Sequence, residues 1–206
     1  MTQSTPKRFV LTAIALAFPI TVAGEKLTEL PLRLLTKGEH GEVWKAHAEG
    51  NEVPPENAMA LYLGLGALVT GLPESTLRKL KRPDYNSLSL AIQRQSQNGA
   101  GDFDKSLPGE DYERLKLLQP ITDADGEVIE ELRIDVPDVE TSLALERIPL
   151  SAGDKRNWYL NQKCTGLGRD ELDRLSLPDW NSLQERLTDF LAGVGASFST
   201  PDPLTA

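Results

Sequence analysis

The sequence predicts an α+β protein made of two repeated small domains, each a β-hairpin followed by three or four helices. Two observations predict this class. A nineteen-residue segment occurs twice in the chain, and a similar order of apolar segments and turns precedes each occurrence. The length of 206 residues, of which 39% are hydrophobic, suits two modest cores of about a hundred residues each.

The repeated segment covers residues 70–88 and 165–183, which align without a gap. Ten of the nineteen aligned pairs are identical, where ordinary residue usage gives about one. Upstream, Pro19-Ile20-Thr21 recurs as Pro120-Ile121-Thr122 and Gly24-Glu25 recurs 102 positions on as Gly126-Glu127. The offset then falls to 95, so the second copy lacks seven residues, which we place in the polar loop of residues 49–55. Because the similarity extends over a whole unit, we interpret the chain as a tandem duplication.

Each copy is expected to begin with a hairpin. Residues 15–22 and 26–35 are apolar segments that flank the turn Ala23-Gly24-Glu25, which is a hairpin signal. Thr36 and Glu39 then have the spacing of a capping box, in which each side chain satisfies a free amide at a helix start. A helix should therefore follow the first hairpin directly.

Further helix boundaries follow from the repeated segment itself. Asn57 is expected to cap an apolar helix that ends at Gly71, where a left-handed glycine stops it, and Gly166 repeats this stop. Pro83-Asp84 and Pro178-Asp179 fit the first turn of a last helix, because proline needs no amide partner there and the carboxylate favours the positive end of the helix dipole.

The expected domain boundaries lie in polar segments rich in glycine and proline. We assign residues 1–95 to the first repeat and residues 112–196 to the second. Residues 96–111 between them are punctuated by glycine and are expected to form a flexible linker. Residues 197–206 are expected to be a disordered tail.

Charge and cysteine content exclude some classes of function. The net charge of −9 is concentrated in residues 101–206, which argues against nucleic acid as a partner of that half. A solvated acidic face is the simpler explanation, and a basic protein surface is the alternative partner. The single Cys164 allows no internal disulfide and indicates no oxidising compartment.

The N-terminus contains a segment that is similar to a secretory signal peptide. Lys7-Arg8 precedes the apolar residues 9–18, and small residues follow at positions 21–23. Export through residues 1–23 is therefore one interpretation. We favour a strand in a cytoplasmic protein, because the same region is echoed inside the second copy, and the run is too short to span a bilayer.

Candidate residues for chemistry are few. His40 and His47 could share a helix face and bind a metal, but no third ligand is spaced convincingly, so we expect no metal. Cys164 aligns with Val69 of the first copy, which predicts a buried core position and not a nucleophile. No catalytic residue and no cofactor is predicted, and the sequence carries no enzyme signature.

The first half carries an ordered series of short motifs: Leu34, Thr36, Gly38 and Glu39, an apolar helix, Thr70-Gly71-Leu72, Leu77 with Leu80, and Pro83-Asp84-Tyr85-Asn86-Ser87-Leu88. The order of these motifs resembles the small tail assembly chaperones of contractile-tailed phages and prophages. The similarity is closest in residues 18–92 and weaker in residues 115–191. Family members are about one copy long, so the duplication departs from the pattern.

The resemblance implies a non-enzymatic protein of the host cytoplasm. Such a chaperone binds the tape-measure protein, keeps it soluble while tail tube subunits polymerise, and is absent from the finished particle. The implied partners are the tape-measure protein and the tail tube protein, with self-association as a further option and with neither nucleic acid nor membrane. Trp44, Tyr85 and Trp180 are candidate partner contacts, because large aromatic residues often anchor interfaces.

Two alternatives remain open from the sequence. The first is a structural tail or adaptor protein that is retained in the particle. The second is an exported binding protein, which depends on residues 1–23 acting as a signal peptide. Core packing is an equally good explanation for each of the three aromatic residues.

Overall fold

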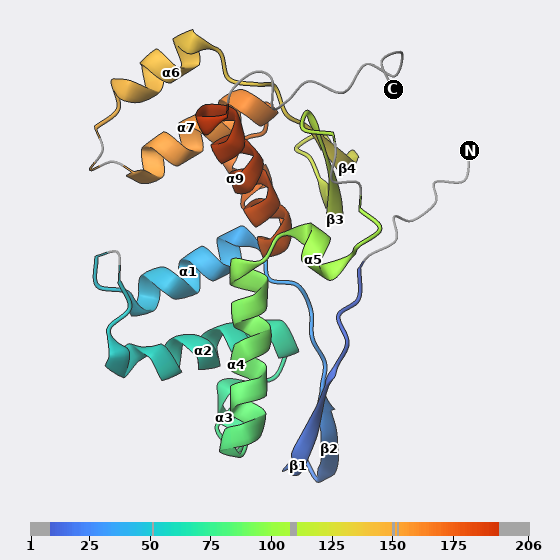
Figure 1. Ribbon diagram of the computed structural model, residues 1–206. Helices are drawn as coiled ribbons and strands as arrows, with labels where there is room; N and C mark the ends of the chain where they lie inside the picture. The colour runs from blue at the N-terminus through green and yellow to red at the C-terminus, as the bar shows by residue number, and fades with distance from the viewer. Residues whose placement is uncertain (1–8, 51, 108–110, 150, 152, 194–206) are drawn as a thin grey trace.

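The computed structural model describes residues 9–50, 52–107, 111–149, 151 and 153–193. The expected disordered tail lies outside these residues, as does the basic start of the signal-like segment. Within the described part, the chain forms nine helices and two antiparallel two-stranded hairpins (Figure 1). The expected mixture of helices and strands is therefore confirmed.

The same order of elements occurs in the first and the second half of the chain. Each half has a hairpin, two helices, a short helix and a last long helix, and α5 lies between the halves. The bounds are β1 Ile14–Val22, β2 Glu25–Leu30, α1 Lys37–His47, α2 Pro55–Thr70, α3 Glu74–Leu77, α4 Arg82–Gln97, α5 Ala100–Phe103, β3 Arg114–Thr122, β4 Val128–Arg133, α6 Val139–Glu146, α7 Gly153–Thr165, α8 Arg169–Leu172 and α9 Leu177–Ala192.

Both hairpins are irregular at the same place. The register of β1 against β2 shifts between Ala15 and Ile20, and that of β3 against β4 shifts between Lys116 and Ile121. Proline explains the irregularity, because it has no amide to give to the neighbouring strand and is tolerated at bulges. Pro19-Ile20-Thr21 and its counterpart at residues 120–122 lie at these shifts.

The start of α1 confirms the predicted capping box. The Glu39 amide donates to Thr36 Oγ1 at 3.2 Å, and the Thr36 amide donates to Glu39 Oε2 at 3.0 Å.

The predicted cap of the next helix is wrong. α2 begins at Pro55, which suits a first helical position, and the side-chain amide of Asn57 instead donates to the carbonyl of His47 at 3.1 Å.

The predicted glycine stops are confirmed. Gly71 and Gly166 have φ angles of 69° and 71°, a region that costs a residue with a Cβ about 1–2 kcal/mol. The threonine before each glycine closes the same turn. Thr70 Oγ1 accepts from the Leu72 amide and Thr165 Oγ1 accepts from the Leu167 amide, each at 3.2 Å.

Each half has its own apolar core. The first is built from the β1–β2 hairpin, α2, α3 and α4, and the second from β3, β4, α7 and α9. Cys164 is buried in the second core, as predicted, and burial raises the pKa of its thiol to about 11. Leu177, at the start of α9, packs into the first core although it belongs to the second half.

The two halves lie against each other along α4, α5 and α9 (Figure 1). In the segment expected to be a linker, α4 continues to Gln97 and α5 packs against α9 and β3. None of the helices in the described part of the chain combines the length and apolar character that a membrane crossing requires.

Candidate functional site

Two buried aspartates join the last long helix of each half to the hairpin of the same half. The carboxylate of Asp84, in the first turn of α4, accepts hydrogen bonds from the amides of Ala17 and Phe18 at 2.8 and 3.0 Å. Asp179, in the first turn of α9, accepts from the amides of Leu118 and Gln119 at 2.7 and 3.1 Å. These amides lie at the bulges and so need an acceptor outside the sheet.

Asp179 is more deeply buried than Asp84. Its side chain is fully buried, and the Ser176 hydroxyl, which caps α9, donates to its carboxylate at 2.6 Å. Burial raises the pKa of Asp179 to about 6, against the lowering effect of hydrogen bonds from Ser176, Leu118 and Gln119. The sequence interpretation explained this aspartate by the helix dipole alone. Its identity in both copies was the signal of a larger role.

A backbone contact joins the start of α1 to the turn before α9. Residues 35–38 form one side of this contact and residues 173–177 form the other, with a single bridge between Thr36 and Ser176. We call it the cap–turn contact. The Leu177 amide donates to the Leu35 carbonyl at 2.8 Å, and the Gly38 amide donates to the Asp173 carbonyl at 2.9 Å. Between these two bonds, the backbone amide of Lys37 donates to the Leu175 carbonyl at 2.8 Å.

Polar side chains of α9 strengthen this junction. Asn181 donates from Nδ2 to the carbonyls of Gln95 and Asn98 at 3.1 and 3.0 Å. The Ser182 hydroxyl accepts from the Ala100 amide at 2.9 Å. Gly99 permits this approach, because a Cβ on it would lie 2.7 Å from that hydroxyl oxygen.

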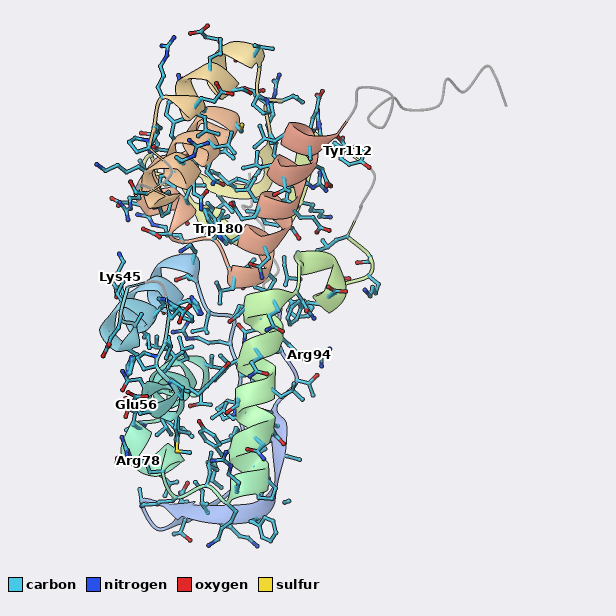
Figure 2. All side chains as sticks on the ribbon, turned by 60° about the vertical axis from the view of Figure 1, so that its left-hand side comes forward. Lys45, Glu56, Arg78, Arg94, Tyr112 and Trp180 are labelled. Atoms are coloured by element: carbon cyan, nitrogen blue, oxygen red, sulfur yellow. The ribbon has the colours of Figure 1, made fainter. Side chains whose placement is uncertain are left out.

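The three aromatic residues predicted as partner contacts come from three different helices. Trp44 on α1 is half-buried and stacks on His40 with 5.9 Å between ring centroids. Tyr85 on α4 is also half-buried and packs against the first core. Trp180 on α9 is 9% exposed and lies at the junction of the halves (Figure 2). The Lys37 ammonium lies 5.4 Å from its ring centroid. Partner binding by these residues stays a prediction.

The two histidines have local partners. His47 Nδ1 makes a hydrogen bond with the Val43 carbonyl at 2.8 Å. Burial, followed by the charge of Lys37, lowers the pKa of His40. Within the described residues, no group of three or more histidine, cysteine, aspartate or glutamate side chains is arranged to hold a metal ion.

An apolar groove of about 390 Å³ runs between the segment before β1, α4 and α5. Val10 and Leu90 are its most exposed apolar side chains, at 80% and 58%, and Leu90 is the one on α4. Arg94 of α4 and Asp102 of α5 supply charge at the groove, and Figure 2 shows Arg94 on the outward side of α4. The remaining apolar lining residues are Phe9, Leu11, Ile14, Leu32, Ala91 and Phe103.

The sequence reasoning missed this groove. Leu88 and Ile92 form the buried stripe of α4, and Leu90 lies between them, on the opposite side of the helix. An apolar residue outside the buried stripe of an amphipathic helix was the available signal. The other wall could not be inferred, because it depends on how residues 9–14 cross α4.

A second groove, of about 420 Å³, lies on the other side of α5, against β3 and α9. It shares Asp102 with the apolar groove but is lined by charged residues, among them Glu185, Arg186 and Asp189. Arg186 donates from Nη1 to the carbonyl of Arg114 at 2.8 Å and also to that of Asp111. Burial lowers the pKa of Arg186, and its bonds hold it to the protein's own backbone.

The site thus offers surfaces for binding, chiefly an apolar groove with a charged rim. Residues 114–192, which run from the first residue of β3 to the last residue of α9, match the family described as phage tail assembly chaperone proteins, E, or 41 or 14. The match falls on the half in which the sequence resemblance was the weaker one. No curated protein and no solved structure matches the chain significantly.

Proposed function

We propose that this protein, whose residues 114–192 match the phage tail assembly chaperone family, binds the tape-measure protein and keeps it soluble while the tail tube polymerises. The match of the second half to this family is the observation that carries the proposal. The proposed role is non-enzymatic, requires no cofactor, and places the protein in the host cytoplasm. The tail tube protein is the second proposed partner, because it must displace the chaperone.

The proposal includes a tandem origin of the two halves. Equivalent contacts in both halves support it. The Arg33 amide donates to the Val69 carbonyl at 2.9 Å, and 102 and 95 positions further on, the Asp135 amide donates to the Cys164 carbonyl at 2.7 Å. With the shared bulges and buried aspartates, these contacts support the proposal that the first half is a second chaperone-like unit.

The apolar groove on α4 is the proposed client site. A soluble protein gains from exposing apolar surface only where a partner covers it, and an amphipathic client helix can lay its apolar face into such a groove. Leu90 would contact the client's apolar stripe, and Arg94 would remain at the polar edge. Two linked units would also raise the effective concentration along an extended client.

The place of residues 14–22 supports retention of the N-terminal segment. They form β1, and Leu16 and Ile20 of this strand are buried in the first core. Cleavage after residue 23 would remove a strand that the core requires. This favours the cytoplasmic interpretation over export.

Co-expression with the tape-measure protein of the same phage or prophage tests the proposal. We expect the tape-measure protein to be soluble and to co-purify with this chain, and we expect assembled particles to lack the chain. Absence of a complex would contradict the chaperone role. Retention in finished particles would instead support a structural tail or adaptor protein.

A pair of matched substitutions tests the groove within the same experiment. Leu90→Glu places a charge in the apolar groove and is expected to reduce the recovered tape-measure protein at least about tenfold, since burying an unpaired charge costs several kcal/mol. Met59→Glu is the control, because Met59 is a helical residue of similar exposure, 48% against 58%, that does not line the groove. Equal loss in both variants would exclude the groove as the client site.

A further inference from the structure

We infer that copies of this protein associate head to tail, by repeating between chains the cap–turn contact that joins the two halves within one chain. The inference goes beyond the proposed chaperone function and rests on the proposed equivalence of the two halves. Within the chain, the start of the first half's α1 is docked on the turn before the second half's α9. In the part of the chain that the structure describes, the equivalent start of α6 and the equivalent turn before α4 make no such backbone contact.

Capping geometry fixes which residues are equivalent. Thr36 caps α1 by accepting from the Glu39 amide, and Asp138 caps α6 by accepting from the Thr141 amide at 2.7 Å. The offset of 102 between these caps is the one that relates Arg33 to Asp135. We call residues 135–143 the open edge and residues 78–82 the basic turn, which aligns with residues 173–177 at the offset of 95.

The open edge exposes apolar side chains at positions whose equivalents in residues 34–37 are covered by the other half. Leu34 is 8% exposed and packs with Ala100 and Leu118 at the junction. Val136 takes the position of Leu34 in the second half, and 52% of its surface is exposed. Val139 takes the position of Lys37, which lies against Trp180, and is 76% exposed.

Backbone groups of the open edge are also available. The amides of Lys37 and Gly38 donate across the docked contact. Their equivalents in Val139 and Glu140 are the first amides of α6, which have no partner within a helix. In the described part of the chain, these two amides donate no hydrogen bond.

The charges of the two open surfaces are complementary. The basic turn exposes four cationic side chains, those of Arg78, Lys79, Lys81 and Arg82. The open edge exposes three carboxylates, those of Asp135, Asp138 and Glu140. Opposite charges of this kind steer association and select the partner. A second copy of the chain supplies both surfaces.

The two halves differ at one position that affects the geometry of the contact between chains. A Cβ on Gly38 would lie 3.1 Å from the carbonyl oxygen of Asp173, and the equivalent position on the open edge is Glu140. The contact between chains must therefore be wider there by a few tenths of an ångström. The same arrangement places the Glu140 carboxylate of one chain opposite Arg78 of the next chain, because Arg78 is equivalent to Asp173.

The positions of the open surfaces exclude closure within one chain. α6 lies at one end of the molecule and α3, next to the basic turn, lies at the other (Figure 1). Arg78 is likewise remote from Trp180, which marks the occupied junction (Figure 2). A contact between two different surfaces at opposite ends builds rings or open chains, not two-fold dimers.

Sedimentation velocity on the purified full chain, without any tail protein, tests this inference independently of the chaperone function. We expect the mass to rise with protein concentration and to fall with added salt, because exposed charge pairs are screened. The double variant Lys81→Glu with Arg82→Glu is expected to weaken association at least about tenfold. The control Lys26→Glu with Lys45→Glu changes the net charge equally on exposed lysines outside the basic turn and should associate like the unaltered protein.

A charge exchange identifies the surfaces. The double variant Asp135→Lys with Glu140→Lys should not associate with itself, because its altered open edge repels its basic turn. Mixing it with the Lys81→Glu, Arg82→Glu variant should restore association, since each chain then finds an opposite charge on the other. A protein that stays monomeric at low salt, or variants that associate unchanged, would overturn the inference. So would failure of the mixture to associate.

Discussion

At the residue scale, the two buried aspartates show how one side chain can hold two elements together. Asp84 and Asp179 each begin the last long helix of a half and each accept two amides from a strand bulge. The bulge leaves those amides without a strand partner, and the carboxylate supplies one. Loss of the Asp179 carboxylate would leave the buried Leu118 amide unsatisfied, which costs about 1–3 kcal/mol.

Asp179 is expected to give the protein a distinctive pH dependence. Its pKa is about 6 in the folded protein, raised by burial, and about 3.9 in an unfolded chain. Between these values the folded state binds more protons than the unfolded state, so the free energy of unfolding falls as pH rises. The shift corresponds to a loss of up to about 3 kcal/mol from pH 4 to pH 7.

Comparison with Asp179→Asn isolates this contribution. The variant cannot ionise, so its stability deficit against the unaltered protein should be largest near pH 4 and should shrink toward pH 7. Urea denaturation at a series of pH values measures it. Asp170→Asn, which removes an exposed carboxylate on α8, is the control. A constant deficit for Asp179→Asn would contradict the prediction.

At the element scale, α1 and α6 show that a helix start can serve as an attachment point. Both begin with a side-chain cap, yet only α1 is docked against another part of the chain through its first amides. The approach at α1 is close because Gly38 has no Cβ. The cap determines where the helix begins, and the glycine determines what can lie against it.

Two glycines on α1 provide a matched test of that approach. Gly41→Ala should stabilise the protein by about 0.5–1 kcal/mol, because alanine has a higher helix propensity than glycine. The added Cβ would meet only the flexible end of the Lys37 side chain, at 3.7 Å. Alanine at Gly38 should destabilise despite the same gain, because its Cβ meets backbone and overpacking costs about 1–3 kcal/mol. Thermal unfolding of both variants checks this. An equal shift in both would contradict it.

The elements that could be predicted from the sequence are those with local chemical causes. The hairpins, the Thr36 cap and the glycine stops all depend on a few neighbouring residues. The start of α2 was misplaced because Pro55 and Asn57 are both plausible helix-start residues, and the interaction of Asn57 with His47 involves a residue ten positions away. Local patterns do not choose between such alternatives.

The candidate site was harder to predict because it depends on long-range packing. Leu90 could have been noticed as an apolar residue outside the stripe of α4, but the wall formed by residues 9–14 could not. The cap–turn contact likewise joins residues about 140 positions apart. Repetition in the sequence indicates what the halves share and says little about how one half lies on the other.

At the scale of the whole molecule, the two halves are coupled through backbone bonds and shared apolar packing. Leu177 starts a helix of the second half but is buried in the first core, and three backbone hydrogen bonds cross the junction beside it. Separation of the halves would expose these groups to water together. We therefore expect both halves to unfold in one transition, despite their separate cores.

Leu187→Ala tests this coupling by hydrogen exchange. Leu187 is buried in the second core only, and the substitution should cost about 2–5 kcal/mol. If unfolding is a single transition, the most protected amides of α2, in the first half, lose as much protection as those of α7, in the second. The reciprocal change Leu65→Ala, in the first core, should affect α7 in the same way. Loss of protection confined to the substituted half would show that the two units fold independently, joined by a contact weaker than either core.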